Sequence, residues 1–137
     1  MKHTSYISIG SNLGNRKKNC HIAIDKLDSF SKIINVSSFY ETEPWGYDDD
    51  NYYINAIIEL KTSLCPHDLL NELKNIETLM GREKKKDSLY HARIIDLDIL
   101  FFDDIILNDN NLIIPHPKLF HRKYVLKPFS EIAPYFV

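Results

Sequence analysis

The sequence has little of what marks several common classes of protein. Its 137 residues include only two cysteines, Cys20 and Cys65, whose spacing matches neither a CxxC pair nor a zinc knuckle. Both lie among apolar residues with helix-like spacing, so we expect buried, reduced thiols. The formal net charge is −2, and the absence of an overall positive field argues against nonspecific binding to nucleic acid or anionic lipid.

Long apolar runs are absent as well. No segment approaches the ~20 apolar residues that cross a bilayer, and residues 1–3 precede the first strand-like run without the apolar core of a secretory leader. We therefore expect a cytoplasmic protein with no membrane partner. The length suits one core, so we treat residues 1–137 as a single domain. Aromatic residues are plentiful by contrast, with eight Tyr and seven Phe, and some of these rings are candidates for ligand binding.

Hydrophobic periodicity predicts two helices among several strands. A strand-like run over 6–9 closes at residues 10–14, where Gly10 and Gly14 suit a turn into a helix. Further along, the pattern predicts a helix over 15–30, strands over 33–43 and 52–60, a helix over 66–80, a strand over 94–102 and a short partner strand over 105–107. This order predicts an α+β, ferredoxin-like fold, with helices packed on a largely antiparallel sheet.

Asp96 and Asp98 provide the clearest chemical signal. The two-residue period of a strand puts both carboxylates on one face, and we expect Leu100 and Phe102 to continue that face. Two like charges in apolar surroundings are costly unless a cation relieves them, and Mg²⁺ prefers oxygen ligands. The alternative is the solvated face of an edge strand, which often carries alternating charges. The apolar neighbours favour the metal site.

A polar segment over 82–93 precedes this strand and holds Arg82, Lys84 and Arg93. Taken alone, its lysine run is typical of a solvated surface. Beside a carboxylate pair, however, these cations suggest a loop that binds the phosphates of a magnesium nucleotide. His116 lies between two prolines and is a candidate either to cap a turn or to donate to a phosphate.

Tyr53 and Asn55 share a face of their predicted strand, which joins a flat ring to an amide with donors and an acceptor. Aromatic residues on strands more often pack in a core, but a buried Asn needs hydrogen-bonding partners. The pair is therefore a candidate for recognising a heterocycle. Trp45 and Tyr124 are further candidate rings with less local support.

Five segments in chain order resemble the 6-hydroxymethyl-7,8-dihydropterin pyrophosphokinase family. They are IGSNLG at 9–14, SFYET at 38–42, YINA at 53–56, RIIDLDIL at 93–100, and IPHP at 114–117 through EIAP at 131–134. They span nearly the whole chain, and the Asp-Leu-Asp strand that follows Arg93 is the most specific of them. The chain departs from the family pattern in the basic loop, where Tyr90-His91-Ala92 stand for the usual Trp-Gly-Pro, and at Glu43-Pro44-Trp45-Gly46.

The resemblance implies a ferredoxin-like enzyme of folate biosynthesis. Such an enzyme transfers a diphosphate from ATP to the hydroxymethyl group of 6-hydroxymethyl-7,8-dihydropterin and releases AMP. It implies that Asp96 and Asp98 hold two Mg²⁺ ions, that Asp96 assists deprotonation of the hydroxyl group, and that Arg82 and Arg93 are also catalytic. The implied nucleotide contacts are Glu77, Arg82, Lys84, Arg93, the backbone at Ile99 and Ile113, His116 and Arg122. The implied pterin contacts are the Thr42 backbone, Trp45, Tyr53, Asn55 and Tyr124.

Two other functions share some of these features. RNA-recognition domains have the same order of strands and helices, but their aromatic signatures are absent and the net charge is negative. A relative that binds pterin or nucleotide without catalysis is suggested by the altered basic loop. We favour the enzyme, acting as a monomer on small molecules and not on nucleic acid.

Overall fold

The computed structural model describes residues 2–42, 52–81, 94–117 and 130–132. The predicted basic loop over 82–93 lies outside the described residues. The elements follow the predicted order of strand, helix, strands, helix and strand. In chain order they are β1 (His3–Ser11), α1 (Arg16–Leu27), β2 (Ser31–Val36), β3 (Tyr40–Thr42), β4 (Tyr53–Thr62), α2 (Pro66–Leu79), β5 (Asp96–Phe102), β6 (Leu107–Asn108) and β7 (Ile113–Ile114).

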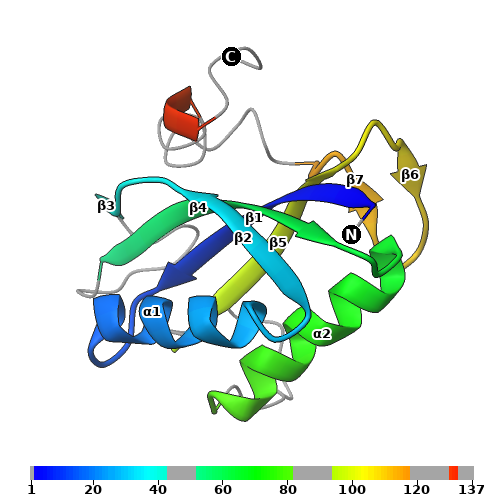
Figure 1. Cartoon of the computed structure of the whole chain (residues 1–137). Coiled ribbons are helices and arrows are strands. Elements are labelled where there is room, and N and C mark those ends of the chain that lie inside the picture. The colour runs from blue at the N-terminus through cyan, green and yellow to red at the C-terminus, as the bar shows by residue number, and fades with distance from the viewer. Residues whose placement is uncertain (1, 43–51, 82–93, 118–129, 133–137) are drawn as a thin grey trace.

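The main sheet has the strand order β2-β4-β1-β5, with β3 paired to β4 beside β2, and these pairings are antiparallel. Both helices pack on one face of this sheet, as Figure 1 shows. The sheet order and the helical layer confirm the predicted α+β, ferredoxin-like architecture. Within the described part of the chain, no helix is long and apolar enough to cross a membrane.

The strand predicted over 33–43 is two strands, because Ser37 interrupts its ladder. β2 pairs with the second half of β4, whereas β3 pairs with its first three residues. Between them the backbone N–H of Ser37 donates to the carbonyl of Ile57 at 2.9 Å. The hydroxyl of Ser37 in turn accepts from the N–H of Ile57 at 2.9 Å. A side chain thus replaces a backbone group in the ladder, which local patterning does not reveal.

The core lies between the sheet and the two helices. Ile7 and Ile9 of β1 point into it, as do Leu69 and Leu73 of α2, and all four are fully buried. Burial of each such aliphatic side chain contributes roughly 1.5–3 kcal/mol. The periodic apolar stripes of both helices therefore have the packing role that the sequence predicted.

The two cysteines differ in their surroundings. Cys20 is buried on the packed side of α1, as predicted, and burial raises the pKa of its thiol to about 12. Cys65 is exposed, so the prediction of a second buried thiol is wrong. It is the N-cap residue of α2, immediately before Pro66, and lies ahead of the helical turns whose stripe packs on the sheet.

The prediction that residues 105–107 form a short strand paired with β5 is also wrong. Asp103 and Asp104 do form a turn, but β6 after them pairs with β7. The outer edge of β5 is taken by other groups. The side chain of Glu77 accepts from the N–H of Leu97 at 2.9 Å, and the N–H of His116 donates to the carbonyl of Leu100 at 3.0 Å.

Candidate functional site

The face of the sheet opposite the helices carries Tyr53, Asn55 and both predicted carboxylates, and we call it the site face. The strand register aligns Tyr40 of β3, Asn55 of β4, Gly10 of β1 and Asp96 of β5 in one row across the sheet. Because directly opposed residues of antiparallel strands point to the same face, this row brings the predicted amide and a predicted carboxylate together. They are two strands apart, about 9–10 Å between backbones.

Two neighbouring rows complete this part of the sheet. Thr42 is opposite Tyr53 in the row beside Asn55, and Ser8 is opposite both Asp98 and Ile57 in the row beyond Asp96. The structure places Tyr53 with Asn55, and Asp96 with Asp98, on shared faces as their spacing predicted, and the register shows that both pairs lie on the same face. Thr42 is described here only by its backbone position.

Asp96 and Asp98 alternate with Leu97, which is buried in the core between sheet and helices. Both aspartates are half-buried and lie on the site face, roughly 7 Å apart along the strand. Among the described residues no group of three or more His, Cys, Asp and Glu could hold a metal ion. Mg²⁺ is commonly held by one or two carboxylates together with substrate phosphates, so this pair fits such an ion.

After Asp98, a β-bulge changes which residues of β5 point to the site face. The register between β1 and β5 shifts between Tyr6 and Ile7, which leaves Leu100 as the extra residue. Leu100 therefore stays on the site-face side, where it packs with Tyr6 and Ile57, as predicted. Phe102 is on the helical side in the main core, so the prediction that it shares the face of the aspartates is wrong.

Gly10 lies in the middle of the row that contains Asn55, although the sequence predicted that it forms part of a turn. It lies inside β1, whereas Gly14, at φ +71°, occupies the turn. A Cβ atom on Gly10 would lie 2.9 Å from Oδ1 of Asn55 and 3.3 Å from Cδ1 of Tyr53. The missing side chain thus provides the space that these two groups occupy. The alternation of Ile7 and Ile9 continues through Ser11 and was the signal for a longer strand.

The predicted nucleotide contacts that the structure describes lie along the outer edge of β5. Glu77 is buried, with 6% of its surface exposed, and binds the edge at Leu97. By the two-residue period, the backbone N–H of Ile99 points to the same outer side as that of Leu97. β7, which includes Ile113, contacts β5, and His116 follows it and binds the carbonyl of Leu100.

Arg16 is a second residue that the sequence did not predict near the site, and it binds the ends of two strands there. Arg16, the first residue of α1, donates to the backbone carbonyl of Tyr52 at 2.7 Å and to the carboxylate of Glu41 at 2.9 Å. Its guanidinium thereby links β3 to the start of β4, beside Tyr53. The remaining predicted site residues, Trp45, Arg82, Lys84, Arg93, Arg122 and Tyr124, lie outside the described residues.

Comparison with known proteins places these features in one family. The family model described as 7,8-dihydro-6-hydroxymethylpterin-pyrophosphokinase (HPPK) matches residues 6–134. A 2-amino-4-hydroxy-6-hydroxymethyldihydropteridine pyrophosphokinase of Bacillus subtilis is 38% identical over 97% of this chain and 80% of its own length. The corresponding protein of Porphyromonas gingivalis is 37% identical over 95% of this chain and 90% of its own length.

Longer proteins contain a similar region. A folic acid synthesis protein of Pneumocystis carinii is 44% identical over 93% of this chain, which spans only 17% of that protein. The solved HPPK-DHPS of Plasmodium falciparum superposes with a TM-score of 0.72 at 21% identity, and the match covers 97% of this chain and 40% of that one. This structural likeness supports the fold. The chain belongs to the 7,8-dihydro-6-hydroxymethylpterin-pyrophosphokinase family.

Proposed function

We propose that this pyrophosphokinase of folate biosynthesis carries out its reaction on the site face, between Asn55 and the pair Asp96 and Asp98. The reaction transfers the diphosphate of ATP to the hydroxymethyl group of 6-hydroxymethyl-7,8-dihydropterin and releases AMP. One observation carries the location: the register sets the amide and the carboxylates on either side of Gly10, whose missing side chain lets Asn55 and Tyr53 approach β1 closely.

Recognition of the pterin falls to the β4 side of this row. Asn55 is 95% buried, and an amide in that position can offer donors and an acceptor to the edge of a heterocycle. Tyr53 lies two residues away on the same face and offers a ring for stacking. We assign the Thr42 backbone, Trp45 and Tyr124 to the same subsite on the strength of the family resemblance.

The carboxylates are proposed to hold two Mg²⁺ ions on the β5 side. When bound, such ions neutralise phosphate charge and align the attacking and leaving oxygens for displacement at phosphorus. Asp96 is in the same row as Asn55, so it is the carboxylate suited to accept the proton of the pterin hydroxyl. Asp98, one row further, is then left to the metal alone.

The nucleotide is proposed to bind along the outer edge of β5. The outward backbone at Ile99 and the neighbouring β7 backbone at Ile113 are suited to hydrogen-bond an adenine edge, and Glu77 supports the strand beside them. Arg82, Lys84, Arg93, His116 and Arg122 are assigned to the phosphates, with Arg82 and Arg93 aiding transfer. The cytoplasmic location, the monomeric state and the single-domain organisation stay predictions.

The first test is an assay for AMP with three components. We expect AMP only when ATP, Mg²⁺ and 6-hydroxymethyl-7,8-dihydropterin are all present. A protein that binds both substrates in the presence of Mg²⁺ but releases no AMP would be a binding relative, and that outcome would overturn the proposed activity.

The metal assignment is tested in the same assay with Asp98→Ala. Loss of a metal-holding carboxylate should reduce AMP formation by about 10³-fold or more, because several kcal/mol of charge stabilisation in the transition state depend on the metal. Asp104→Ala removes an exposed carboxylate from the turn after the same strand and should leave the rate unchanged. Equal rates of AMP formation in the two variants would show that Asp98 is not a metal ligand.

A further inference from the structure

A carboxylate near the C-terminus fastens the last described segment to the site face. Residues 130–132 form a short helical turn on the side of the sheet opposite α1 and α2 (Figure 1). Oε2 of Glu131 accepts from the backbone N–H of Ser38 at 3.2 Å and from its hydroxyl at 2.9 Å. Oε1 of Glu131 accepts from the hydroxyl of Tyr40. Both oxygens of one side chain therefore bind groups around the start of β3.

The same turn has an apolar contact on the sheet. Ile132 packs against the small cluster of Tyr6, Ile57 and Leu100 on the site-face side. The turn is thus attached at two places, by hydrogen bonds to β3 and by packing over β4, β1 and β5. Glu131 itself is exposed, so its contacts are with specific partners at the surface and not the result of core packing.

The partner of Glu131 stands beside the proposed pterin subsite. Tyr40 is opposite Asn55 in the register, and Asn55 is opposite Gly10. With its hydroxyl held by Glu131, the Tyr40 ring lies next to the amide that is proposed to read the pterin. The three hydrogen bonds of Glu131 go to Ser38 and Tyr40, at the edge of the sheet opposite β5 and its nucleotide residues, so we expect a change at Glu131 to act on the pterin subsite first.

We propose that Glu131 is a positioning residue for the pterin subsite, which it orders by fixing Tyr40 beside Asn55 and by holding the C-terminal turn over the site face. This inference rests on the proposed function. A carboxylate suits the position because an ionised carboxylate only accepts hydrogen bonds, and three donors converge on it. Charge-assisted bonds of this kind are about twice as strong as neutral ones.

The test substitution is Glu131→Gln, which keeps the shape but removes the negative charge, so the charge-assisted hydrogen bonds from Ser38 and Tyr40 become weaker neutral ones. We expect the KM and the dissociation constant of the pterin to rise about tenfold, in line with the loss of a hydrogen bond to a charged group. The KM of ATP should stay within about twofold, because the substitution leaves the β5 edge intact. Pterin binding is measured by fluorescence titration with Mg²⁺ and a non-hydrolysable ATP analogue, and both KM values by AMP release.

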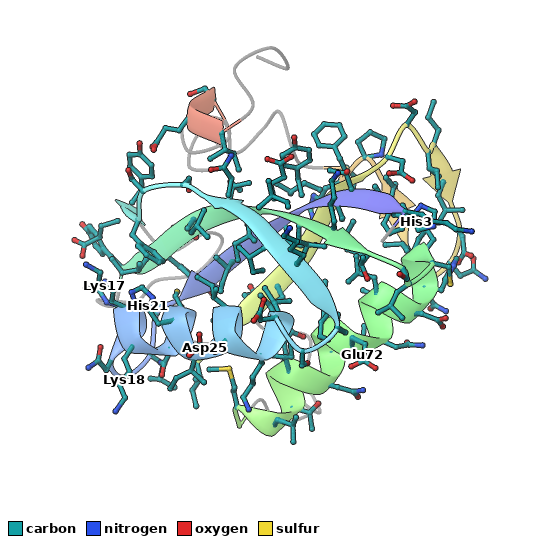
Figure 2. The ribbon with its side chains drawn as sticks, viewed as in Figure 1. His3, Lys17, Lys18, His21, Asp25 and Glu72 are labelled. Carbon is teal, nitrogen blue, oxygen red and sulfur yellow. The ribbon has the colours of Figure 1, made fainter. Side chains whose placement is uncertain are left out.

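Two further variants separate positioning from loss of fold. Tyr40→Phe removes only the hydroxyl at the other end of the bond, so it should weaken pterin binding to a similar extent. The double variant should be no worse than the weaker-binding single one, because both remove the same bond. Glu72→Gln makes the same chemical change on α2, on the helical side of the sheet, and should alter neither KM (Figure 2).

The outcomes distinguish the inference from the function on which it rests. Unchanged pterin affinity in both Glu131→Gln and Tyr40→Phe, or equal changes in the KM of both substrates, would overturn the role of Glu131 while wild-type AMP release upholds the function. A wild-type protein that binds pterin more tightly than Glu131→Gln but forms no AMP would overturn the function alone. A wild-type protein that does not bind pterin would overturn both.

Discussion

Gly10 and Gly14 lack a side chain for different physical reasons, and this difference gives a test of the site face. Gly10 has an ordinary strand backbone, but an added Cβ would meet Oδ1 of Asn55 at 2.9 Å. Gly14 has φ +71°, but an added Cβ would meet only Nδ2 of Asn19, at 3.8 Å. One position is limited by space at the site and the other by backbone conformation.

Gly10→Ala should therefore reduce pterin affinity by about tenfold or more, since the loss of even one well-placed hydrogen bond to Asn55 has that effect, with little loss of stability. Gly14→Ala should lower the free energy of unfolding by about 1–3 kcal/mol and leave the KM of the pterin unchanged. Chemical unfolding and steady-state kinetics of both variants measure the two effects. Unaltered pterin binding in Gly10→Ala would mean that Asn55 and Tyr53 do not contact the substrate.

Wherever a strand is regular, the spacing of residues correctly predicted which side chains point to the same face of the sheet. Tyr53 with Asn55, and Asp96 with Asp98, share the site face as the two-residue period required. Phe102 does not, because the β-bulge opposite Tyr6 and Ile7 reverses the alternation, and a bulge arises from pairing with another strand. Single-residue spacing contains no information about that partner.

At the scale of elements, the order of strands and helices was predictable, but the pairing of the short strands was not. β5 was expected to form a hairpin with the residues after it, whereas Glu77 of α2 and the backbone at His116 occupy its outer edge. Both groups are far from β5 in sequence. Glu77 lies there because α2 packs beside β5, and His116 because β7 does, and no short pattern specifies either contact.

The turn after β5 is fastened to the start of β1, and this link is sensitive to pH. Thr4 donates its N–H to Oδ1 of Asp103 at 2.8 Å, and a ring nitrogen of His3 lies 2.7 Å from Oδ2. Burial alone would raise the pKa of Asp103, but these two contacts outweigh it and lower the pKa below its ordinary value. The carboxylate therefore stabilises the fold while it is ionised.

Because the folded-state pKa of Asp103 is depressed, its contribution is fully present above about pH 4 and is lost as pH falls through the folded-state pKa. Asp103→Asn should lower the urea midpoint at pH 6, and the gap to wild type should narrow as pH falls to 3. Asn suits the test because it tolerates φ +48° at this position. A gap that stays constant from pH 6 to pH 3 would show that the charge of Asp103 contributes nothing.

At the scale of the molecule, the fold places the main core on one face of the sheet and the proposed site on the other. The helical side holds the main core, whereas the site face holds the aligned row from Tyr40 to Asp96 and the small cluster around Ile57. A ferredoxin-like sheet with helices on only one side makes this division possible. The fold and the carboxylate pair were predictable from sequence because both depend on local periodicity, whereas the role of Glu131 depends on contact between segments more than 90 residues apart.

The reactivity of the two cysteine thiols can show whether the core on the helical side unfolds together with the nucleotide site. Cys20 is fully buried and burial raises its pKa to about 12, so the native protein keeps it as an unreactive thiol, whereas Cys65 is exposed. A thiol reagent at pH 8 should therefore modify Cys65 at once and Cys20 only when the core opens.

If that opening is global, ATP with Mg²⁺ at 100 times its dissociation constant should slow modification of Cys20 by about 100-fold, because only the folded state binds the nucleotide. Mass spectrometry of the labelled protein separates the two sites, and Cys65 is the internal control. Modification of Cys20 at the rate of Cys65 would contradict the buried position of Cys20 on α1. A slow rate that does not depend on nucleotide would mean that α1 opens without disturbing the nucleotide site.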